Sequence, residues 1–353
     1  MAAIPAPSNH EEKRAAFLLD WLKRAGAKGA AIDEACNVIL PMGCEGRDNI
    51  HVYMAHTDVV FPDETPLPVK EDAEKIHAPG VGDDTANVCV LLLCIRYILE
   101  NGLEPKKPVL FAFNSGEEGL GNLRGIRQIM KDYAGRVASV VSLDGTLDGL
   151  CDCAVGSERW RVTVRTEGGH SYANFGNRNA IHGLASMIAT LYDVKVPSEG
   201  TTTYNVGGIS GGTSVNTIAQ EAEMLYEYRA DRRENLESMA KMFAAVVEAY
   251  RAMGLTVAAE LLGQRPCMGD VDPDALELLL ARCAALIERE AGKAPKRHSG
   301  STDANIPFSL GVPATTFGAY RGRGAHTREE WIEKASLLPG LRVAMALILE
   351  HFS

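Results

Sequence analysis

Short apolar runs alternate with helical patterns along the first part of the chain. The runs Ile50 to Ala55, Val109 to Phe113 and Ala138 to Leu143 are rich in β-branched or aromatic residues, as buried strands are. Apolar residues recur at helical spacing between residues 84 and 102 and again between residues 120 and 132. Strands that alternate with helices in this way predict an α/β domain with a mixed, mostly parallel sheet.

The pattern changes after Cys153. Residues 156–265 have the order strand, helix, strand, strand, helix, strand, which predicts a compact α+β insert of the ferredoxin-like kind. The earlier type of pattern returns from residue 266, with two more helices and a strand. We therefore expect a discontinuous larger domain formed by residues 1–155 and 266–353, interrupted by the smaller inserted domain.

Length, charge and hydropathy exclude several classes of protein. The 353 residues are enough for two domains with a sizeable buried core. The formal charge of −10, without a block of basic residues, argues against binding to nucleic acid or to an anionic membrane. The longest uncharged apolar stretch, Thr85 to Ile95, is too short for a membrane span, which takes about 20 residues. No secretory signal is visible, so we expect a cytoplasmic protein.

Polar residues follow the first predicted strand. His56 and Asp58 are two residues apart in extended chain, where their side chains lean to the same side. A carboxylate in that position can hold the imidazole tautomer that metal binding needs. Asp83 lies in a Gly-rich turn before a helix, where metal binding and helix capping are both open interpretations. We favour capping for its neighbour Asp84.

Two adjacent carboxylates follow the second buried strand. Because neighbouring side chains on extended backbone point in opposite directions, one of Glu117 and Glu118 can face a bound water while the other faces a metal ion. An acidic turn before a helix is the alternative. Asp144 closes the next strand and His326 lies in a polar Gly-rich loop, and each alone is typical of an ordinary turn or loop residue.

Taken together, these residues predict one metal site. The carboxyl ends of parallel strands meet at one edge of a sheet, where such folds gather ligands. Imidazole and carboxylate donors without a thiolate suit zinc or a similar divalent ion, and five ligands with one bridging carboxylate suit two ions. The predicted ligands are His56, Asp83, Glu118, Asp144 and His326. His298 is a rival imidazole, which we interpret as a loop residue.

At these residues the chain resembles the dizinc metallopeptidases that include aminoacylase, peptidase T, the glutamate carboxypeptidases and succinyl-diaminopimelate desuccinylase, and peptidase T-like members most of all. The shared motifs cover nearly the whole chain in the family's order. They are HTDVV at 56–60, PGVGDD at 79–84, EEG at 117–119, LDG at 143–145, GGHS at 168–171, GSTDAN at 300–305 and GAHT at 324–327. The resemblance implies a zinc-exopeptidase-like catalytic domain whose insert serves as a lid and dimerisation domain.

The resemblance also implies a role for each predicted ligand. Asp83 would bridge two divalent ions, and His56 and Asp144 would bind different ions. Glu118 and His326 would complete the two sites. Zinc is the expected metal, with cobalt and manganese as alternatives because they share such ligands.

Further roles follow from the same resemblance. Glu117 would be the general base, and Asp58 would orient the first histidine. His170 matches a histidine that the insert presents to the active site of the partner subunit, where it helps to stabilise an oxyanion, so a homodimer is implied. Asn216 and Arg229 match positions that hold polar groups of the substrate, the arginine usually its carboxylate.

We expect hydrolysis of an amide bond in a short peptide, by an aminopeptidase that acts on di- or tripeptides. Two divalent ions lower the pKa of water between them towards about 7 and so supply hydroxide at neutral pH. Glu117 would take the water's proton and pass it to the leaving nitrogen. An N-acyl amino acid hydrolase and a carboxypeptidase are alternatives, and a non-catalytic dimeric relative is another. The last is disfavoured because all five ligands and Glu117 are present.

Overall fold

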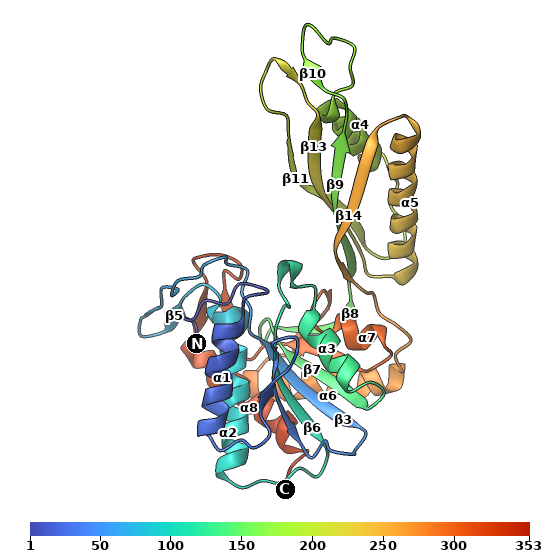
Figure 1. Cartoon of the computed structure of the whole chain (residues 1–353). Coiled ribbons are helices and arrows are strands. Elements are labelled where there is room, and N and C mark those ends of the chain that lie inside the picture. The colour runs from blue at the N-terminus through green and yellow to red at the C-terminus, as the bar shows by residue number, and fades with distance from the viewer. The chain divides into compact units, whose positions relative to one another are not determined.

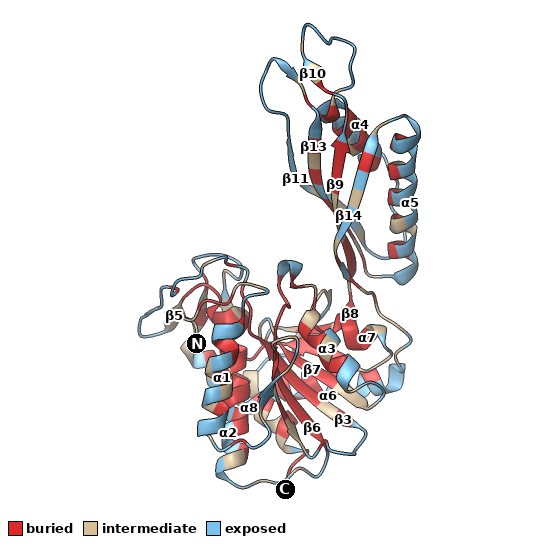
Figure 2. Cartoon of the chain, viewed as in Figure 1, coloured by how far each residue is buried: buried red, intermediate tan, exposed pale blue.

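The computed structural model describes residues 1–353, which divide into two compact units. Unit 1 comprises residues 1–154 and 269–353, and unit 2 comprises residues 155–268. Both units appear in Figure 1, and each has buried residues on the inner faces of its sheet and helices (Figure 2). None of the helices combines the length and apolar character that crossing a membrane requires.

Unit 1 is built on a mixed sheet of eight strands in the order β1-β2-β6-β3-β7-β16-β8-β15. At its centre β3 is parallel to both β6 and β7, and β16 is parallel to β7. The strands are β1 (Ala31–Ile32), β2 (Val38–Met42), β3 (Ile50–His56), β6 (Val109–Asn114), β7 (Val137–Leu143), β8 (Gly149–Ala154), β15 (Lys296–Gly300) and β16 (Ala314–Phe317). The expected α/β class with a mixed, mostly parallel sheet is confirmed.

Helices cover both faces of this sheet. In Figure 1, α1, α2 and α8 lie on one side of the sheet, and α3 and α7 lie on the other. The crossovers from β3 to β6 and from β6 to β7 run in opposite directions along the sheet, so right-handed connections place α2 and α3 on opposite faces. The helices are α1 (Glu12–Arg24), α2 (Asn87–Glu100), α3 (Arg124–Asp132), α6 (Pro273–Ala291), α7 (Asn305–Ser309) and α8 (Lys334–Leu349).

The elements of unit 1 differ from the sequence prediction at a few places. The helix expected from residue 120 begins at Arg124, because Asn122 and Leu123 have positive φ angles of 55° and 58° that interrupt helical backbone. Strands β2, β8 and β15 were not expected. β15 is the last strand of the sheet and has the sequence KRHSG, so it lacks the apolar pattern of a central strand.

A second, four-stranded sheet in unit 1 joins segments that are far apart in the sequence. β18 pairs with β5 in antiparallel register, with Trp331 opposite His77. Buried Val81, Tyr320 and Ile332 belong to a small apolar cluster that packs in this region. The pairing places the chain after β5 beside the chain before β18. The strands are β4 (Lys70–Glu71), β5 (Lys75–His77), β17 (Gly322–Arg323) and β18 (Trp331–Glu333).

Unit 2 is an antiparallel sheet in the order β11-β13-β9-β14, which two helices cover. With the chain order strand, helix, strand, strand, helix, strand, this is the ferredoxin-like arrangement. Phe243 packs against Trp160, Tyr226 and Tyr228 in a core that belongs to this unit. The elements are β9 (Gly156–Arg165), β10 (Gly169–His170), α4 (Ala180–Tyr192), β11 (Thr202–Gly211), β12 (Thr217–Ile218), β13 (Glu221–Ala230), α5 (Arg233–Ala252) and β14 (Thr256–Arg265).

Candidate metal centre

The predicted ligands of unit 1 come from the carboxyl ends of neighbouring parallel strands. His56 is the last residue of β3, Glu117 and Glu118 follow β6, and Asp144 directly follows β7. Because β3 lies between β6 and β7 in the sheet, these three segments meet at one edge. The fold therefore brings together residues that are up to 88 positions apart, from 56 to 144.

His56 is fixed by a contact at each ring nitrogen. Its Nδ1 lies 3.1 Å from the backbone carbonyl oxygen of Asp58, which accepts the Nδ1 proton. Its Nε2 lies 3.0 Å from Oδ1 of Asp83. The side chain of His56 is buried. Neutral His56 with its proton on Nδ1 presents the Nε2 lone pair, as a metal ligand does.

Asp83 faces a second imidazole with its other oxygen. Nε2 of His326 lies 3.1 Å from Oδ2 of Asp83 and 2.9 Å from Oε1 of Glu118. Asp83 thus directs Oδ1 towards one histidine and Oδ2 towards the other. A carboxylate in this position can bridge two ions, and that was the arrangement predicted for it.

Potential ligand atoms fall into overlapping groups in which all atoms lie within 4.8 Å of one another. The groups are His56 with Asp83, Asp84 and Asp144, then Asp83 with Glu118 and His326, and also His56 with Glu117 and Glu118. The adjacent strands β3 and β7 bring His56 and Asp144 into the same group, whereas the sequence predicts that they bind different ions. Imidazole and carboxylate donors without a thiolate fit two ions such as zinc, cobalt or manganese.

Crowded carboxylates give the centre an excess of negative charge. Burial raises the pKa of Asp84 well above its usual range, and the charges of Asp144 and Asp83 raise it further. Burial and the charge of Asp83 raise the pKa of Asp144 to about 7. Hydrogen bonds to Asp83 and Glu118 raise the pKa of His326 to about 10. Because this cluster strongly favours additional positive charge, it is suited to binding cations.

The carboxylate of Asp58 holds the backbone of the two glutamates. It accepts the backbone N–H groups of Glu117 at 3.0 Å and Glu118 at 2.9 Å, and the hydroxyl of Ser8 at 2.7 Å. The distance from this carboxylate to Nδ1 of His56 is 3.5 Å, longer than the distance to the backbone carbonyl of Asp58. Asp58 therefore contacts His56 chiefly through its main chain, while its side chain shapes the turn that carries Glu117.

The capping role favoured for Asp84 is wrong. The residue at the N-cap of α2 is Ala86, and no side chain caps the helix. Buried Asp84 instead accepts the backbone N–H of His56 at 2.8 Å and the side-chain amide of Asn87 at 2.6 Å. The Asp83–Asp84 peptide bond is cis. Asp84 thus connects the turn that carries Asp83 to the end of β3.

Sequence reasoning did not single out Glu330. Its buried carboxylate accepts backbone N–H groups from the turn that contains Asp83. Burial, opposed by those hydrogen bonds and assisted by the charge of Asp83, raises the pKa of Glu330 to about 7. The one available signal was its place four residues after His326, in GRGAHTREEW. An acidic residue in a polar loop gives no indication of burial.

His298 lies outside the ligand groups. It is on β15 rather than in the expected loop, and its Nδ1 lies 3.3 Å from the backbone carbonyl oxygen of Lys296. Together with Asp144, Thr302 and Thr316 it lines a hollow of about 260 Å³. The hollow opens beside one candidate ligand, but His298 itself joins no cluster of ligand atoms.

His170 and Asn216 lie side by side in unit 2, on the paired segments around β10 and β12. The backbone N–H of Ser171 donates to the carbonyl of Asn216 at 2.9 Å. Nδ1 of exposed His170 accepts the backbone N–H groups of Tyr172 at 3.2 Å and Ala173 at 3.3 Å. The proton of the neutral ring is therefore on Nε2, which is a hydrogen-bond donor.

Arg229 lies at the opposite end of β13. This strand begins at Glu221, just after β12, and Arg229 is eight residues further along, or roughly 27 Å in extended chain. Its guanidinium contacts the carboxylate of Glu227 at 3.1 and 3.0 Å. Within unit 2, the structure therefore brings His170 and Asn216 together but not Arg229.

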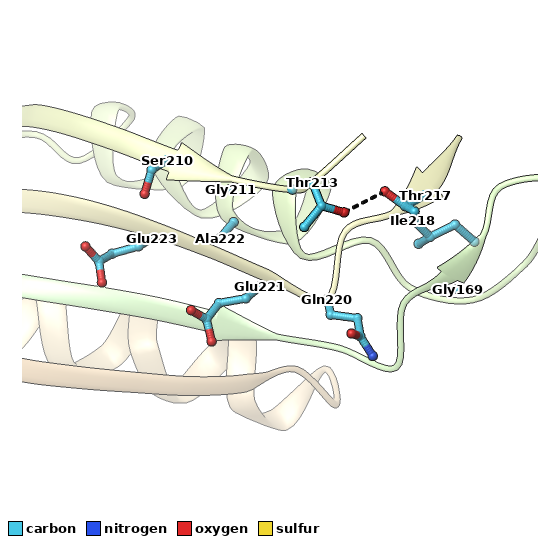
Figure 3. A pocket seen from close by; sticks show the side chains of 11 residues that line it. Gly169, Ser210, Gly211, Thr213, Thr217, Ile218, Gln220, Glu221, Ala222 and Glu223 are labelled. Atoms are coloured by element: carbon cyan, nitrogen blue, oxygen red, sulfur yellow. Dashed lines mark hydrogen bonds between the residues drawn. The ribbon is translucent and has the colours of Figure 1, made fainter. Parts of the chain in front are cut away.

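A larger hollow of about 670 Å³ adjoins the β10–β12 pair in unit 2 (Figure 3). Its lining includes Gly211, Gly212, Glu221 and Glu223, as well as Thr213 and Thr217, whose hydroxyls lie 3.1 Å apart. No imidazole and no thiol lines it. This hollow therefore lacks the donor set of the candidate centre in unit 1.

Comparison with known proteins identifies similar sequences and folds. The sequence pattern of the peptidase family M20/M25/M40 matches residues 52–350. Succinyl-diaminopimelate desuccinylase of Corynebacterium glutamicum is 23% identical over 346 residues, which cover 93% of this chain and 88% of that protein. The fold is similar to that of aminopeptidase PepT from Bacillus cereus, with TM-score 0.75, 20% identity and coverage of 99% and 95%. It is also similar to YXEP from Bacillus subtilis, a dinuclear metal-binding peptidase, with TM-score 0.67, 14% identity and coverage of 99% and 96%.

Proposed function

Because the chain belongs to the peptidase family M20/M25/M40, whose members are metallopeptidases and related amidohydrolases, we propose that it cleaves an amide bond in di- or tripeptides as an aminopeptidase. The observation that carries the proposal is the position of Asp83 between two histidines. One oxygen lies 3.0 Å from His56 and the other lies 3.1 Å from His326. The similarity to the fold of PepT supports a peptide substrate.

Five side chains would hold two divalent ions, with zinc as the expected metal. His56 and Asp144 would serve one ion, Glu118 and His326 would serve the other, and Asp83 would bridge them. When bound, two such ions lower the pKa of a water molecule and polarise the scissile carbonyl.

Glu117 would act as the general base. Its side chain is buried beside Glu118 and His56, and the carboxylate of Asp58 fixes its backbone N–H at 3.0 Å. From that position Glu117 would accept a proton from the attacking water and deliver it to the leaving nitrogen. The same group then acts in both halves of the reaction, so its loss removes both proton transfers.

Unit 2 would supply the groups that bind substrate. His170 would donate its Nε2 proton to the oxyanion that forms at the carbonyl, and in a homodimer it would do so from the partner subunit. Asn216 would bind a polar group of the substrate, and Arg229 would bind its carboxylate. We propose that the protein is a cytoplasmic homodimer in which unit 2 serves as a lid.

A second candidate, hydrolysis of an N-acyl amino acid, is favoured by the similarity to succinyl-diaminopimelate desuccinylase. The chemistry at the carbonyl is the same, because this reaction also breaks an amide bond. The two candidates differ only in the groups on either side of that bond. Carboxypeptidase activity belongs to the same alternative.

The test is cleavage by the zinc-loaded and cobalt-loaded protein of a panel of dipeptides, tripeptides, N-acyl amino acids and longer peptides, followed by mass spectrometry. We expect cleavage of short peptides at the amino end, and a decrease in kcat of roughly 10²- to 10⁴-fold in Glu117→Gln with both ions retained. Cleavage of N-acyl amino acids alone would favour the second candidate. No cleavage by the metal-loaded dimer would contradict the proposal and favour a non-catalytic relative.

A further inference from the structure

Glu330 connects two segments that carry candidate metal ligands. It follows His326 by four residues, directly before β18. Its carboxylate accepts the backbone N–H of Gly80 at 2.6 Å, of Gly82 at 2.9 Å and of Asp83 at 2.8 Å. One side chain from the loop of His326 is thus bonded directly to the main chain of the bridging residue.

Both oxygens of this carboxylate are used, and no cationic side chain pairs with it. Oε2 accepts from Gly80, while Oε1 accepts from both Gly82 and Asp83. Glu330 is only 1% exposed. A buried carboxylate is costly unless hydrogen bonds compensate it, and these N–H groups have no partner within a helix because they lie at its first turn. The three hydrogen bonds therefore satisfy both partners at once.

The surrounding backbone leaves the turn little room to move. The carbonyl of Glu330 accepts the N–H of Ala78 at 3.2 Å, next to the β5–β18 pairing. A Cβ atom on Gly82 would lie 2.4 Å from the hydroxyl of Tyr320, so this glycine packs directly against that ring. Main-chain and side-chain contacts of Glu330 thus hold the turn from two sides.

We propose that Glu330 is a positioning residue that fixes Asp83 relative to His326 and so determines how tightly the second ion binds. The inference rests on the proposed two-metal function. His56 and Asp144 come from the ends of central strands, so the sheet itself positions them. The group formed by Asp83 and His326 draws on two loops that Glu330 connects, and it is this group that its loss disturbs.

The experiment compares Glu330→Gln with Glu329→Gln, an exposed neighbour of the same type. Glutamine keeps the size of the side chain but places an NH₂ donor where one carboxylate oxygen accepted backbone N–H groups. Zinc affinity and stoichiometry are measured by competition with a chelator, and the thermal midpoint is measured on metal-free protein. We expect Glu330→Gln to bind the ion near Asp83 and His326 roughly 10- to 100-fold less tightly than the wild type does. The other ion shares only Asp83 with the first and keeps His56 and Asp144, so it should lose less affinity, and Glu329→Gln should bind both ions normally.

If Glu330→Gln binds both ions with the affinity of the wild type while its thermal midpoint is lower, the inference is overturned. A purely structural role of Glu330 predicts that result. Glu330→Asp provides a second test should Glu330→Gln not fold. Its side chain is one methylene too short to reach the turn, so the same selective loss is expected, and normal binding of both ions would again overturn the inference. A wild type that binds two ions without cleaving any substrate would contradict only the proposed function. A wild type that binds fewer than two ions would contradict both.

Discussion

Strand β3 carries a histidine near each end, and the two imidazoles differ in character. Burial and the charge of Lys107 lower the pKa of His51 to about 4. At the other end burial also opposes a charge on His56, but neighbouring carboxylates, led by Asp84, raise its pKa well above the usual range. The rings lie five residues, or roughly 17 Å, apart along one strand.

The partners of the two imidazoles explain the difference. His51 stacks on His351 with ring centroids 4.2 Å apart, and its Nδ1 lies 2.8 Å from the hydroxyl of Ser139. Nε2 of His351 lies 2.9 Å from the hydroxyl of Tyr53. Rings and hydroxyls favour a neutral imidazole, whereas the loops after the carboxyl ends of the strands supply aspartates and glutamates. A buried histidine is thus a candidate ligand only where the fold gathers carboxylates around it.

The largest expected effect comes from a matched pair of substitutions on β3. His56→Gln should lose metal and decrease kcat/KM roughly a hundredfold or more, because it removes a predicted ligand. His51→Gln should retain the zinc content and the activity of the wild type, since its ring lies at the far end of the strand. Zinc content and kcat/KM of both variants are the measurements. Equal losses in the two variants would show that the two ends of β3 do not differ as we describe.

A smaller effect concerns the pH dependence of stability at the His51 end. Burial and the charge of His51 lower the pKa of His351 from 6.5 to about 3. Between these values the unfolded chain binds a proton that the folded chain does not. The stability associated with neutral His351 is therefore fully present above pH 6.5 and is lost as the pH falls, by up to about 1.4 kcal/mol per pH unit.

His351→Gln should remove this part of the slope. Urea unfolding of the wild type and the variant, from pH 7.5 to 4.5, gives the difference in unfolding free energy, in which the contribution of the metal centre cancels. His182→Gln, at an exposed position on α4, is the control and should change the slope little. Parallel curves for the wild type and His351→Gln would argue that His351 is already protonated in the folded state.

The fold class and the composition of the centre could be predicted from the sequence for a physical reason. Central parallel strands are buried on both faces, so they are visible as apolar runs, and their ends are where His56 and Asp144 stand. Once parallel neighbours are inferred, those ends must meet. How the candidate ligands divide between ions could not be predicted in this way, because it depends on which strand ends are adjacent.

Other features of the centre have no local signal. The contacts of Glu330 are hydrogen bonds to backbone N–H groups about 250 residues away, between positions 80 and 330, and backbone groups leave no trace in the sequence. Asp84 was misinterpreted for the same reason, since its partner is the main chain of His56. In unit 2, His170 and Arg229 are both plausible from motifs. Only the strand register shows that His170, on β10, pairs with the segment just before β13, while Arg229 lies near the far end of β13.

The most direct test is a crystal structure of the zinc-loaded protein, with anomalous scattering recorded at the zinc absorption edge. We expect two peaks per chain, about 3.5 to 4 Å apart. One should lie beside His56 and Asp144 and the other beside Glu118 and His326, with Asp83 between them. Zinc peaks elsewhere, or a single peak that Asp83 does not contact, would contradict the two-metal centre.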